Sequence, residues 1–287
     1  MFSETKKEIS KRLLWACENP EDFVLRVNLL CRLKNRSTRV AWDSGKQLFV
    51  VQSPTLAPMY IARVNRIKEK YLDGRNRPKE IFDKYLLSQV SFSAGDVCID
   101  VGANIGELAV HLVRNFQVKA ICFEPDPVEF RCLQANLKGS DSILYNKALW
   151  IEETFLEFHL ANDTGDSSLL PTRNELPTMQ VETLTLKSVY EELSSEKNPL
   201  RIKLLKLEAE GAEPEILKGG LDMLPFIEYI AADLGPERGP ERKHTICECV
   251  NLLTQRNFEL VGVNPKTQVY LFHNNMSCLG VEKNVHN

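Results

Sequence analysis

The sequence predicts an α/β fold in which helices cover both faces of a mainly parallel sheet and an antiparallel hairpin adds its last two strands. After residue 95, apolar runs alternate with amphipathic segments, which is typical of strands joined by crossover helices. Most of these runs are continuously apolar, as strands buried on both faces are. The last two runs, 258–264 and 267–274, are joined by a short turn containing Asn-Pro-Lys, so we expect them to form a hairpin.

The first 90 residues have a different pattern. Apolar residues recur at helical spacing in 3–18 and in 59–90, and the sequence GRNRP at 74–78 divides the second stretch in two. Between them, residues 39–52 predict a β-hairpin with Asp-Ser-Gly at its turn. We therefore expect a mainly helical extension over 1–90 that caps a ligand cleft, a ligand-binding domain over 91–275 and a tail over 276–287.

Within 91–275 the elements follow in regular order. The predicted buried strands are 95–102, 118–126, 142–150, 202–211 and 227–235. The predicted helices are 104–116, 127–139, 214–224 and 244–257. Two further segments, 154–161 and 179–186, alternate between polar and apolar residues like exposed antiparallel strands, and a polar loop separates them.

Composition excludes several classes of protein. Hydrophobic residues make up 43% of the 287 residues and charged residues 26%, values typical of a globular chain and not of a disordered or collagenous one. No apolar run reaches the length of a membrane span, and no signal peptide is visible. The eight cysteines are scattered, which favours free thiols in a reducing cytoplasm.

Charge is unevenly distributed along the chain. Residues 1–90 hold 18 basic and 10 acidic residues, whereas the remainder holds 18 basic and 29 acidic residues. The basic density of the first part is below that expected of a nucleic-acid-binding protein. It suggests an anionic acceptor such as a nucleotide sugar or uronic acid, although the solvated faces of amphipathic helices give the same pattern.

The ends of the first two strands of the domain suggest a nucleoside site. In open α/β sheets, ligands bind beyond the carboxyl ends of the strands. The first strand ends at Asp100, Gly102 permits a sharp backbone turn, and Gly106 permits close approach of the next helix or of a ligand. Twenty-four residues after Asp100, Glu124 ends the second strand and is placed to accept hydrogen bonds from ribose hydroxyls.

Two ligands use such an arrangement. A dinucleotide favours G-x-G-x-x-G, whereas this chain has D-x-G-x-x-x-G, in which Asp100 would repel a pyrophosphate. S-adenosylmethionine has no phosphate, and it carries an ammonium group from which Asp100 can accept a hydrogen bond. The pattern therefore favours S-adenosylmethionine over NAD. An Asp100 that merely caps a helix would not explain the glycines and Glu124 together.

Three motifs resemble the FkbM-type family of S-adenosylmethionine-dependent methyltransferases: VCIDVGANIGELAVHL at 97–112, ICFEPDP with the later ANL, and LLKLEAEGAEPEILKG at 204–219. The resemblance implies the class I methyltransferase (Rossmann-like) fold, a seven-stranded sheet of order 3-2-1-4-5-7-6. It also implies methyl transfer to a hydroxyl oxygen of a sugar or secondary metabolite.

The resemblance also assigns donor-binding residues. Asp100, Gly102, Ala103, Asn104 and Gly106 would form the methionine-side loop, Glu124 would bind the ribose, and Pro125 and Asp126 would flank the adenine. Asn146, Ala148 and Leu149 would line the adenine slot, and Ser167 and Ser168 match a serine-containing loop of the family. One position departs from the family pattern, because Glu208 stands where an aspartate is usual.

The candidate catalytic residues follow the fourth and fifth strands. On an extended strand Lys206, Glu208 and Glu210 would share one face. Glu208 or Glu210 is a candidate base for the acceptor hydroxyl, or a ligand for a divalent ion that acidifies it, and Lys206 is equally explained as an ion-pair partner of a neighbouring glutamate. Glu213 suits a helix start, next to Pro214. Asp233 is another candidate acid, and His244 is a candidate acceptor contact.

The sequence thus predicts an O-methyltransferase acting on a hydroxyl of a sugar or glycan precursor. Three alternatives remain open at this point. The first is a methyltransferase for a polyketide or lipid hydroxyl, which would need a largely apolar acceptor cleft. The second is an inactive scaffold that keeps the fold, and the third is an NAD enzyme.

Overall fold

The computed structural model describes residues 17, 19–161, 167–171, 175–195 and 199–276. The chain divides into two compact units, Met1–Arg77 and Pro78–Asn287. Nearly all of the predicted helix at 3–18 and of the predicted tail at 276–287 lies outside the described residues. No helix among the described residues is both long and apolar enough to cross a bilayer.

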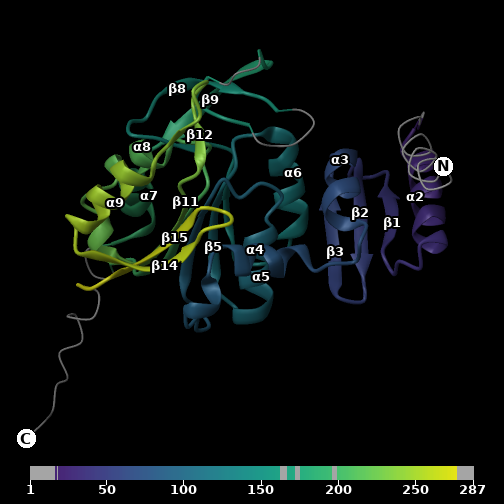
Figure 1. Cartoon of the computed structure of the whole chain (residues 1–287), viewed down its shortest axis with the longest axis horizontal. Helices are drawn as coiled ribbons and strands as arrows, with labels where there is room; N and C mark the ends of the chain where they lie inside the picture. Colours follow the sequence, from purple (N-terminus) through teal and green to yellow (C-terminus); the bar gives the residue numbers. More distant parts are fainter. Residues whose placement is uncertain (1–16, 18, 162–166, 172–174, 196–198, 277–287) are drawn as a thin grey trace, which may run out of the picture. The chain divides into compact units, whose positions relative to one another are not determined.

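The described part of the first unit combines a long helix with a small sheet (Figure 1). It contains α2 (Pro20–Leu33), β1 (Arg39–Asp43), β2 (Leu48–Ser53), β3 (Leu56–Ile61), α3 (Val64–Arg66) and the π-helical turn η1 (Ile67–Tyr71). Asn19 caps α2 by accepting a hydrogen bond from the Asp22 amide at 2.8 Å. The antiparallel pairing of β1 with β2 confirms the predicted hairpin.

One prediction for this unit is wrong. Met59 and Ile61 were expected in a helix, but they lie in β3, which pairs antiparallel with β2. Both side chains are fully buried, opposite Val51 and Phe49. Their spacing of two residues matches the alternation of a strand, and the pairing with β2 decides between the two patterns.

The second unit contains the predicted seven-stranded sheet. The first half of its elements is α4 (Arg77–Lys84), η2 (Leu87–Gln89), β4 (Val97–Val101), α5 (Glu107–Phe116), β5 (Lys119–Phe123), α6 (Pro127–Asn136), β6 (Ile143–Tyr145), β7 (Ala148–Leu149) and β8 (Phe155–His159). The second half is β9 (Thr178–Leu184), α7 (Leu186–Leu193), β10 (Ile202–Leu207), α8 (Glu213–Lys218), η3 (Leu224–Phe226), β11 (Ile227–Asp233), β12 (Pro236–Arg238), β13 (Lys243–His244), α9 (Ile246–Thr254), β14 (Phe258–Asn264) and β15 (Val269–Asn274).

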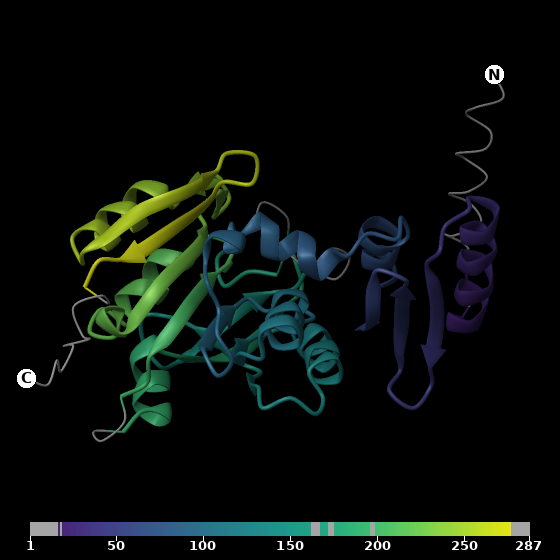
Figure 2. The same cartoon turned by 90° about the horizontal axis from the view of Figure 1, so that it is seen from below.

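The order of the sheet is β14-β15-β11-β10-β4-β5-β6. Strands β6, β5, β4, β10 and β11 run parallel, and β15 and β14 are antiparallel additions at one edge, visible in yellow in Figure 2. Numbered along the chain, this is the order 3-2-1-4-5-7-6, so the predicted topology is confirmed. Residues 78–90, which the sequence analysis placed in the extension, belong to the compact unit that holds this sheet.

The predicted strand 142–150 is two strands. β6 pairs with β5 in the main sheet, whereas Ala148 and Leu149 form β7, which pairs with β9 in a separate three-stranded sheet of order β7-β9-β8. The break falls at Asn146, whose side chain donates hydrogen bonds to the Glu124 and Pro125 carbonyl oxygens. The predicted antiparallel pair is confirmed as β8 and β9.

The two faces of the main sheet form different cores. Leu205 and Leu207 of β10 lie in an apolar core with residues of α7, α8 and α9, whereas Leu204 lies in a core with residues of α4 and α5. Because side chains alternate along a strand, Lys206 lies on the face of Leu204. By the same alternation Asp100 of β4 and Asp233 of β11 lie on that face, toward the end of α4.

Candidate active site

The turn after β4 depends on a glycine. Gly102 has φ +67°, and a Cβ atom placed on it would lie 1.9 Å from the backbone oxygen of Glu208. The amides of Gly102 and Ala103 both donate to the Phe123 carbonyl oxygen at 3.0 Å. The ends of β4, β5 and β10 therefore meet tightly at Gly102, with no room for a side chain.

Glu124 joins the loops that follow β4 and β5. Its Oε2 accepts from the Asn104 amide at 2.7 Å and its Oε1 accepts from the Asp126 amide at 2.8 Å. The side chain is buried, and this burial raises the pKa of Glu124 to about 8 despite the two amide donors. Asp126 in turn caps α6 by accepting from the Val128 amide at 2.9 Å.

The raised pKa of Glu124 makes folding stability depend on pH. The carboxyl group ionises near pH 4.5 when unfolded but keeps its proton to about pH 8 when folded, so over this range the folded state binds more protons. We expect the free energy of unfolding to fall as pH rises from about 5 to 8, by roughly 4 kcal/mol from this group. Urea denaturation of Glu124→Gln across that range should show a flatter pH dependence, and an unchanged slope would contradict the assignment.

The remaining residues assigned to the donor lie around these loops. Gly106 has φ +86°, and a Cβ on it would lie 2.7 Å from Leu133 Cδ1 of α6, so here glycine accommodates the packing of a helix. Ala103, Ala148 and Leu149 are buried, and Asn146 is exposed. Ser167 Oγ donates to Asp126 Oδ2 at 3.4 Å, which brings the predicted serine loop to the end of β5.

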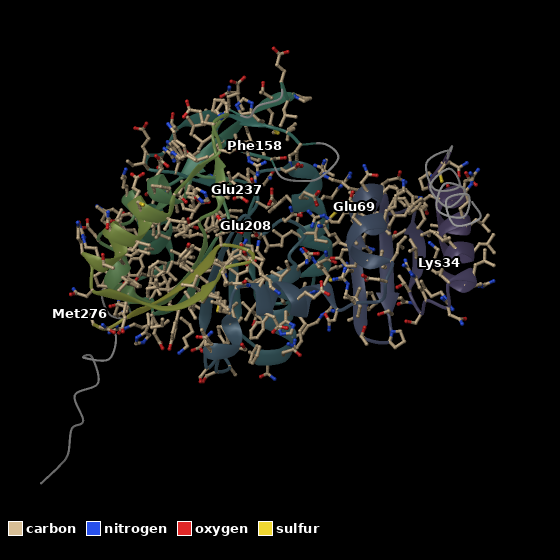
Figure 3. The ribbon with its side chains drawn as sticks, viewed as in Figure 1. Lys34, Glu69, Phe158, Glu208, Glu237 and Met276 are labelled. Carbon is tan, nitrogen blue, oxygen red and sulfur yellow. The ribbon has the colours of Figure 1, made fainter. Side chains whose placement is uncertain are left out.

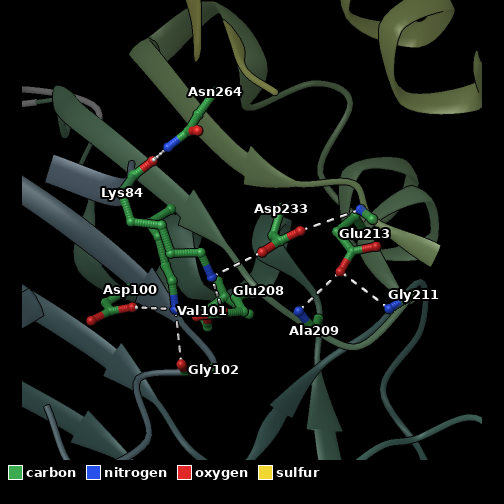
Figure 4. A network of polar contacts seen from close by, with 12 residues as sticks. Lys84, Asp100, Val101, Gly102, Glu208, Ala209, Gly211, Glu213, Asp233 and Asn264 are labelled. Carbon is green, nitrogen blue, oxygen red and sulfur yellow. Dashed lines mark hydrogen bonds and ion pairs between the residues drawn. The ribbon is translucent and has the colours of Figure 1, made fainter. Parts of the chain in front are cut away.

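A lysine–carboxylate network of Lys84, Asp100, Lys206, Glu208 and Asp233 lies at the carboxyl ends of β4, β10 and β11 (Figure 4). Lys206 Nζ is 3.0 Å from Asp100 Oδ1 and 3.3 Å from Glu208 Oε2, and it donates to the carbonyl oxygens of Val101 and Gly102 at 2.9 and 2.8 Å. The buried ammonium group thus ties β10 to β4.

The second cation of the network, Lys84, was not predicted. It is the last residue of α4, and its Nζ is 2.6 Å from Glu208 Oε1 and 2.9 Å from Asp233 Oδ2. The ring of Tyr85 is fully buried, and its centroid is 5.0 Å from Lys84 Nζ and 5.5 Å from Lys206 Nζ. α4 therefore completes the site, together with the strands predicted for it.

The network gives its carboxylates different proton affinities. Burial would raise the pKa of Glu208, but the ammonium groups of Lys206 and Lys84 outweigh it and hold that pKa well below its usual range. Burial raises the pKa of Asp233, although Lys84 opposes the shift. Glu208 is consequently a weak base, and both of its oxygens already face ammonium groups.

Comparison with known proteins decides the family. A family model described as the methyltransferase FkbM domain matches residues 100–260, more than half of the chain. The chain belongs to the FkbM methyltransferase family. The resemblance inferred from the three sequence motifs, and with it S-adenosylmethionine as the methyl donor, is confirmed.

Individual relatives of this FkbM methyltransferase are more distant. Methyltransferase sdnD of Sordaria araneosa is 30% identical over 172 residues, which cover 49% of this chain and 66% of sdnD, just under two thirds of its length. The 2-O-methyltransferase NoeI of Sinorhizobium fredii is 26% identical over 188 residues, covering 59% of this chain and 75% of NoeI. The solved structure of a TehB-like SAM-dependent methyltransferase from Corynebacterium glutamicum has 8% identity and a TM-score of 0.42, with 74% and 93% of the two chains covered.

Other predicted residues of the FkbM methyltransferase differ from the network in conformation, partners or exposure. β10 ends at Leu207 and Glu210 has φ +51°, so the expectation that Glu210 continues the face of Lys206 on an extended strand is wrong. Glu213 is buried and accepts from the Ala209 amide at 2.9 Å and the Thr245 hydroxyl at 3.1 Å. His244 is exposed in β13. Among the described residues, no group of three or more His, Cys, Asp or Glu side chains is arranged to hold a metal ion.

Sequence reasoning missed one acid of the FkbM methyltransferase, Glu237. It lies half-buried in β12, directly after the end of β11 (Figure 3). Burial, followed by the negative charges of Asp233 and Glu208, raises the pKa of Glu237 to about 8. The polar segment GPER at 235–238 follows a predicted strand and could have indicated Glu237. From the loop that begins there, only His244 was predicted as a site residue.

Proposed function

We propose that this FkbM methyltransferase transfers a methyl group from S-adenosylmethionine to a hydroxyl oxygen of a sugar or glycan precursor. The observation that carries the proposal is the polar character of the site at the ends of β10 and β11, where Lys84, Glu208 and Asp233 lie together. A polyketide or lipid acceptor would favour an apolar lining. The relative NoeI is named a 2-O-methyltransferase, which supports an oxygen acceptor.

The residues at the carboxyl ends of β4 and β5 suit the donor. Asp100 Oδ2 is buried and has no hydrogen-bond partner among the described residues, so it can accept from the ammonium group of the methionine part. Glu124, whose two oxygens each accept one amide, keeps lone pairs for the ribose hydroxyls. When bound, the donor supplies an electrophilic methyl group, and the role of the protein is to hold the acceptor oxygen in line with it.

Donor binding is the first test. Calorimetric titration with S-adenosylmethionine should show that Asp100→Asn and Glu124→Gln each weaken binding about 10- to 100-fold, because Asp100→Asn removes the acceptor of the ammonium group and Glu124→Gln replaces an oxygen beside the ribose hydroxyls with an amide NH2 group. Asp96→Asn is a matched control, since Asp96 precedes β4 at its opposite end and its side chain accepts a local hydrogen bond from the Ser93 amide. A native protein that is folded but does not bind the donor would overturn the proposal.

The acceptor is tested with isotopically labelled donor and a panel of neutral hexoses, uronic acids, nucleotide sugars and apolar phenols. Label in a methyl ether of a sugar supports the proposal, and label only in apolar acceptors supports the polyketide or lipid alternative. Donor binding without transfer to any acceptor supports the inactive scaffold.

Because residues 1–90 are basic, we propose that the acceptor is anionic. Equal methylation rates on acidic and neutral sugars at several salt concentrations would contradict this proposal.

We also propose that the enzyme works in the cytoplasm, as the sequence analysis expected. The seven cysteines within the described residues form no disulfide with one another, and five of them, Cys31, Cys98, Cys122, Cys132 and Cys249, are buried. Buried thiols of this kind suit a reducing compartment.

A further inference from the structure

Three side-chain oxygens converge on the space beside Gly235, directly after β11. A Cβ atom built on Gly235 would lie 3.2 Å from Asp233 Oδ1, 3.5 Å from Gln268 Oε1 and 3.9 Å from Glu237 Oε1. The oxygens come from the end of β11, from β12 and from the turn before β15. A Cβ atom on Gly235 would fill the space among them and would lie closer to Asp233 Oδ1 than an ordinary van der Waals contact allows.

Two of the side chains around this space carry a buried oxygen that lacks a donor within the described part of the chain, whereas Asp233 Oδ1 accepts from the Gly235 amide. Glu237 Oε2 and Gln268 Oε1 are buried and have no hydrogen-bond partner among the described residues, and the same holds for Thr267 Oγ1 in the same turn. An unpartnered buried polar atom costs about 1–3 kcal/mol, so such atoms in one place indicate a missing ligand. The amide oxygen of Gln268 and the ionised form of Glu237 only accept hydrogen bonds, and a ligand with several O–H donors complements them.

The two acids beside the space differ in their partners. Asp233 Oδ2 is 2.9 Å from Lys84 Nζ, and Asp233 Oδ1 accepts from the Gly235 amide at 3.2 Å, so both oxygens of Asp233 already have a partner. Glu237 forms no ion pair among the described residues. Burial, followed by the negative charges of Asp233, Glu208 and Glu213, raises the pKa of Glu237, and the Lys84 ammonium group opposes this shift. Of the two, Glu237 is the one whose environment favours the uptake of a proton.

We propose that the space beside Gly235 binds the reacting hydroxyl of a polyhydroxylated acceptor and that Glu237 is the general base for it, with Gln268 and Asp233 accepting from neighbouring hydroxyls. This inference rests on the proposed function. In the transfer step the acceptor oxygen forms a bond to the methyl carbon while the carbon–sulfur bond of the donor breaks. The sulfur keeps the electron pair, and the hydroxyl proton passes to the Glu237 carboxylate.

The first test is single-turnover methyl transfer to the most active sugar of the panel as a function of pH. In the native enzyme the rate should rise with pH and level off above about pH 8, because Glu237 must lose its proton to act as a base. Glu237→Gln should lower the rate at least 100-fold and abolish that rise, while the affinity for the donor stays unchanged. Glu241→Gln is the matched control, since Glu241 is exposed in the same loop and pairs with Lys243. A rate for Glu237→Gln within 3-fold of the native rate would overturn the proposal.

The second test does not depend on turnover. Gly235→Ala places a methyl group among the three oxygens, and φ at Gly235 is not in the left-handed region. We expect it to weaken calorimetric binding of the same sugar at least 10-fold in the presence of the demethylated donor, with unchanged binding of that donor product. Unchanged sugar binding would contradict the acceptor site.

Two results with the native enzyme have other meanings. Donor binding without methylation of any hydroxyl would refute the proposed function. Loss of activity in EDTA with recovery on adding Mg²⁺ would show that the carboxylates hold an ion, contrary to the proposed site.

Discussion

Gly102→Ala is expected to lower the free energy of unfolding of the methyltransferase unit by about 4 kcal/mol or more. The new Cβ would lie 1.9 Å from the Glu208 backbone oxygen, so the ends of β4 and β10 would have to separate. This separation would also disturb the hydrogen bond from Lys206 to the Gly102 carbonyl oxygen. Urea denaturation measures the loss, and calorimetry of the variant should show that donor binding falls with it.

A closely matched control exists in the same unit. Gly239 has the same φ, +67°, but a Cβ there would meet nothing within 4 Å. Gly239→Ala therefore reports the backbone strain alone, about 1 kcal/mol. Equal losses in the two variants would show that the contact between Gly102 and Glu208 relaxes at little cost, contrary to our expectation.

Lys206→Met should have an effect of similar size through charge. The substitution leaves Asp100 buried with no cation, and breaking a buried pair in this way costs about 3–5 kcal/mol. The unpaired Asp100 would then take up a proton more readily, so the loss should be larger at pH 8 than at pH 5. Equilibrium urea denaturation at both pH values tests the size and the direction of the effect.

Two further variants separate charge from packing. Adding Asp100→Asn to Lys206→Met removes the stranded carboxylate and should recover part of the lost stability. Lys203→Met, three residues earlier on β10, removes a partly exposed pair with Glu228 and should cost less than about 1 kcal/mol. A double variant less stable than Lys206→Met alone would contradict the view that the unpaired charge causes the loss.

Much of the fold was predictable because burial on both faces leaves a continuous apolar run. Strands β4, β5, β10 and β11 were all predicted from such runs, and the resemblance to the family supplied their order. Predictions failed where two patterns fit the same residues. Met59 and Ile61 fit a helix and a strand equally, and 142–150 has apolar residues on both sides of Asn146 and Lys147 although its second half pairs with another sheet.

The site was predictable only as far as strand ends define it. Asp100, Lys206, Glu208 and Asp233 were chosen from the sequence, and the structure links them through the two lysines. Lys84 was missed because nothing local to α4 indicates that its last residue reaches the ends of β10 and β11. Glu237 was missed because its proton affinity depends on charges contributed by other strands.

The hairpin of β14 and β15 offers a route to altered acceptor range. Asn264 donates to the Lys84 carbonyl oxygen at 3.1 Å, and the Gln268 carbonyl oxygen accepts from the Leu234 amide at 3.1 Å, so both ends of the turn are fixed to the site. Between them Pro265 and Lys266 are exposed. Insertions at these two positions would lengthen a loop beside Gln268 without interrupting the sheet, which makes the turn a natural position for diversification in directed evolution.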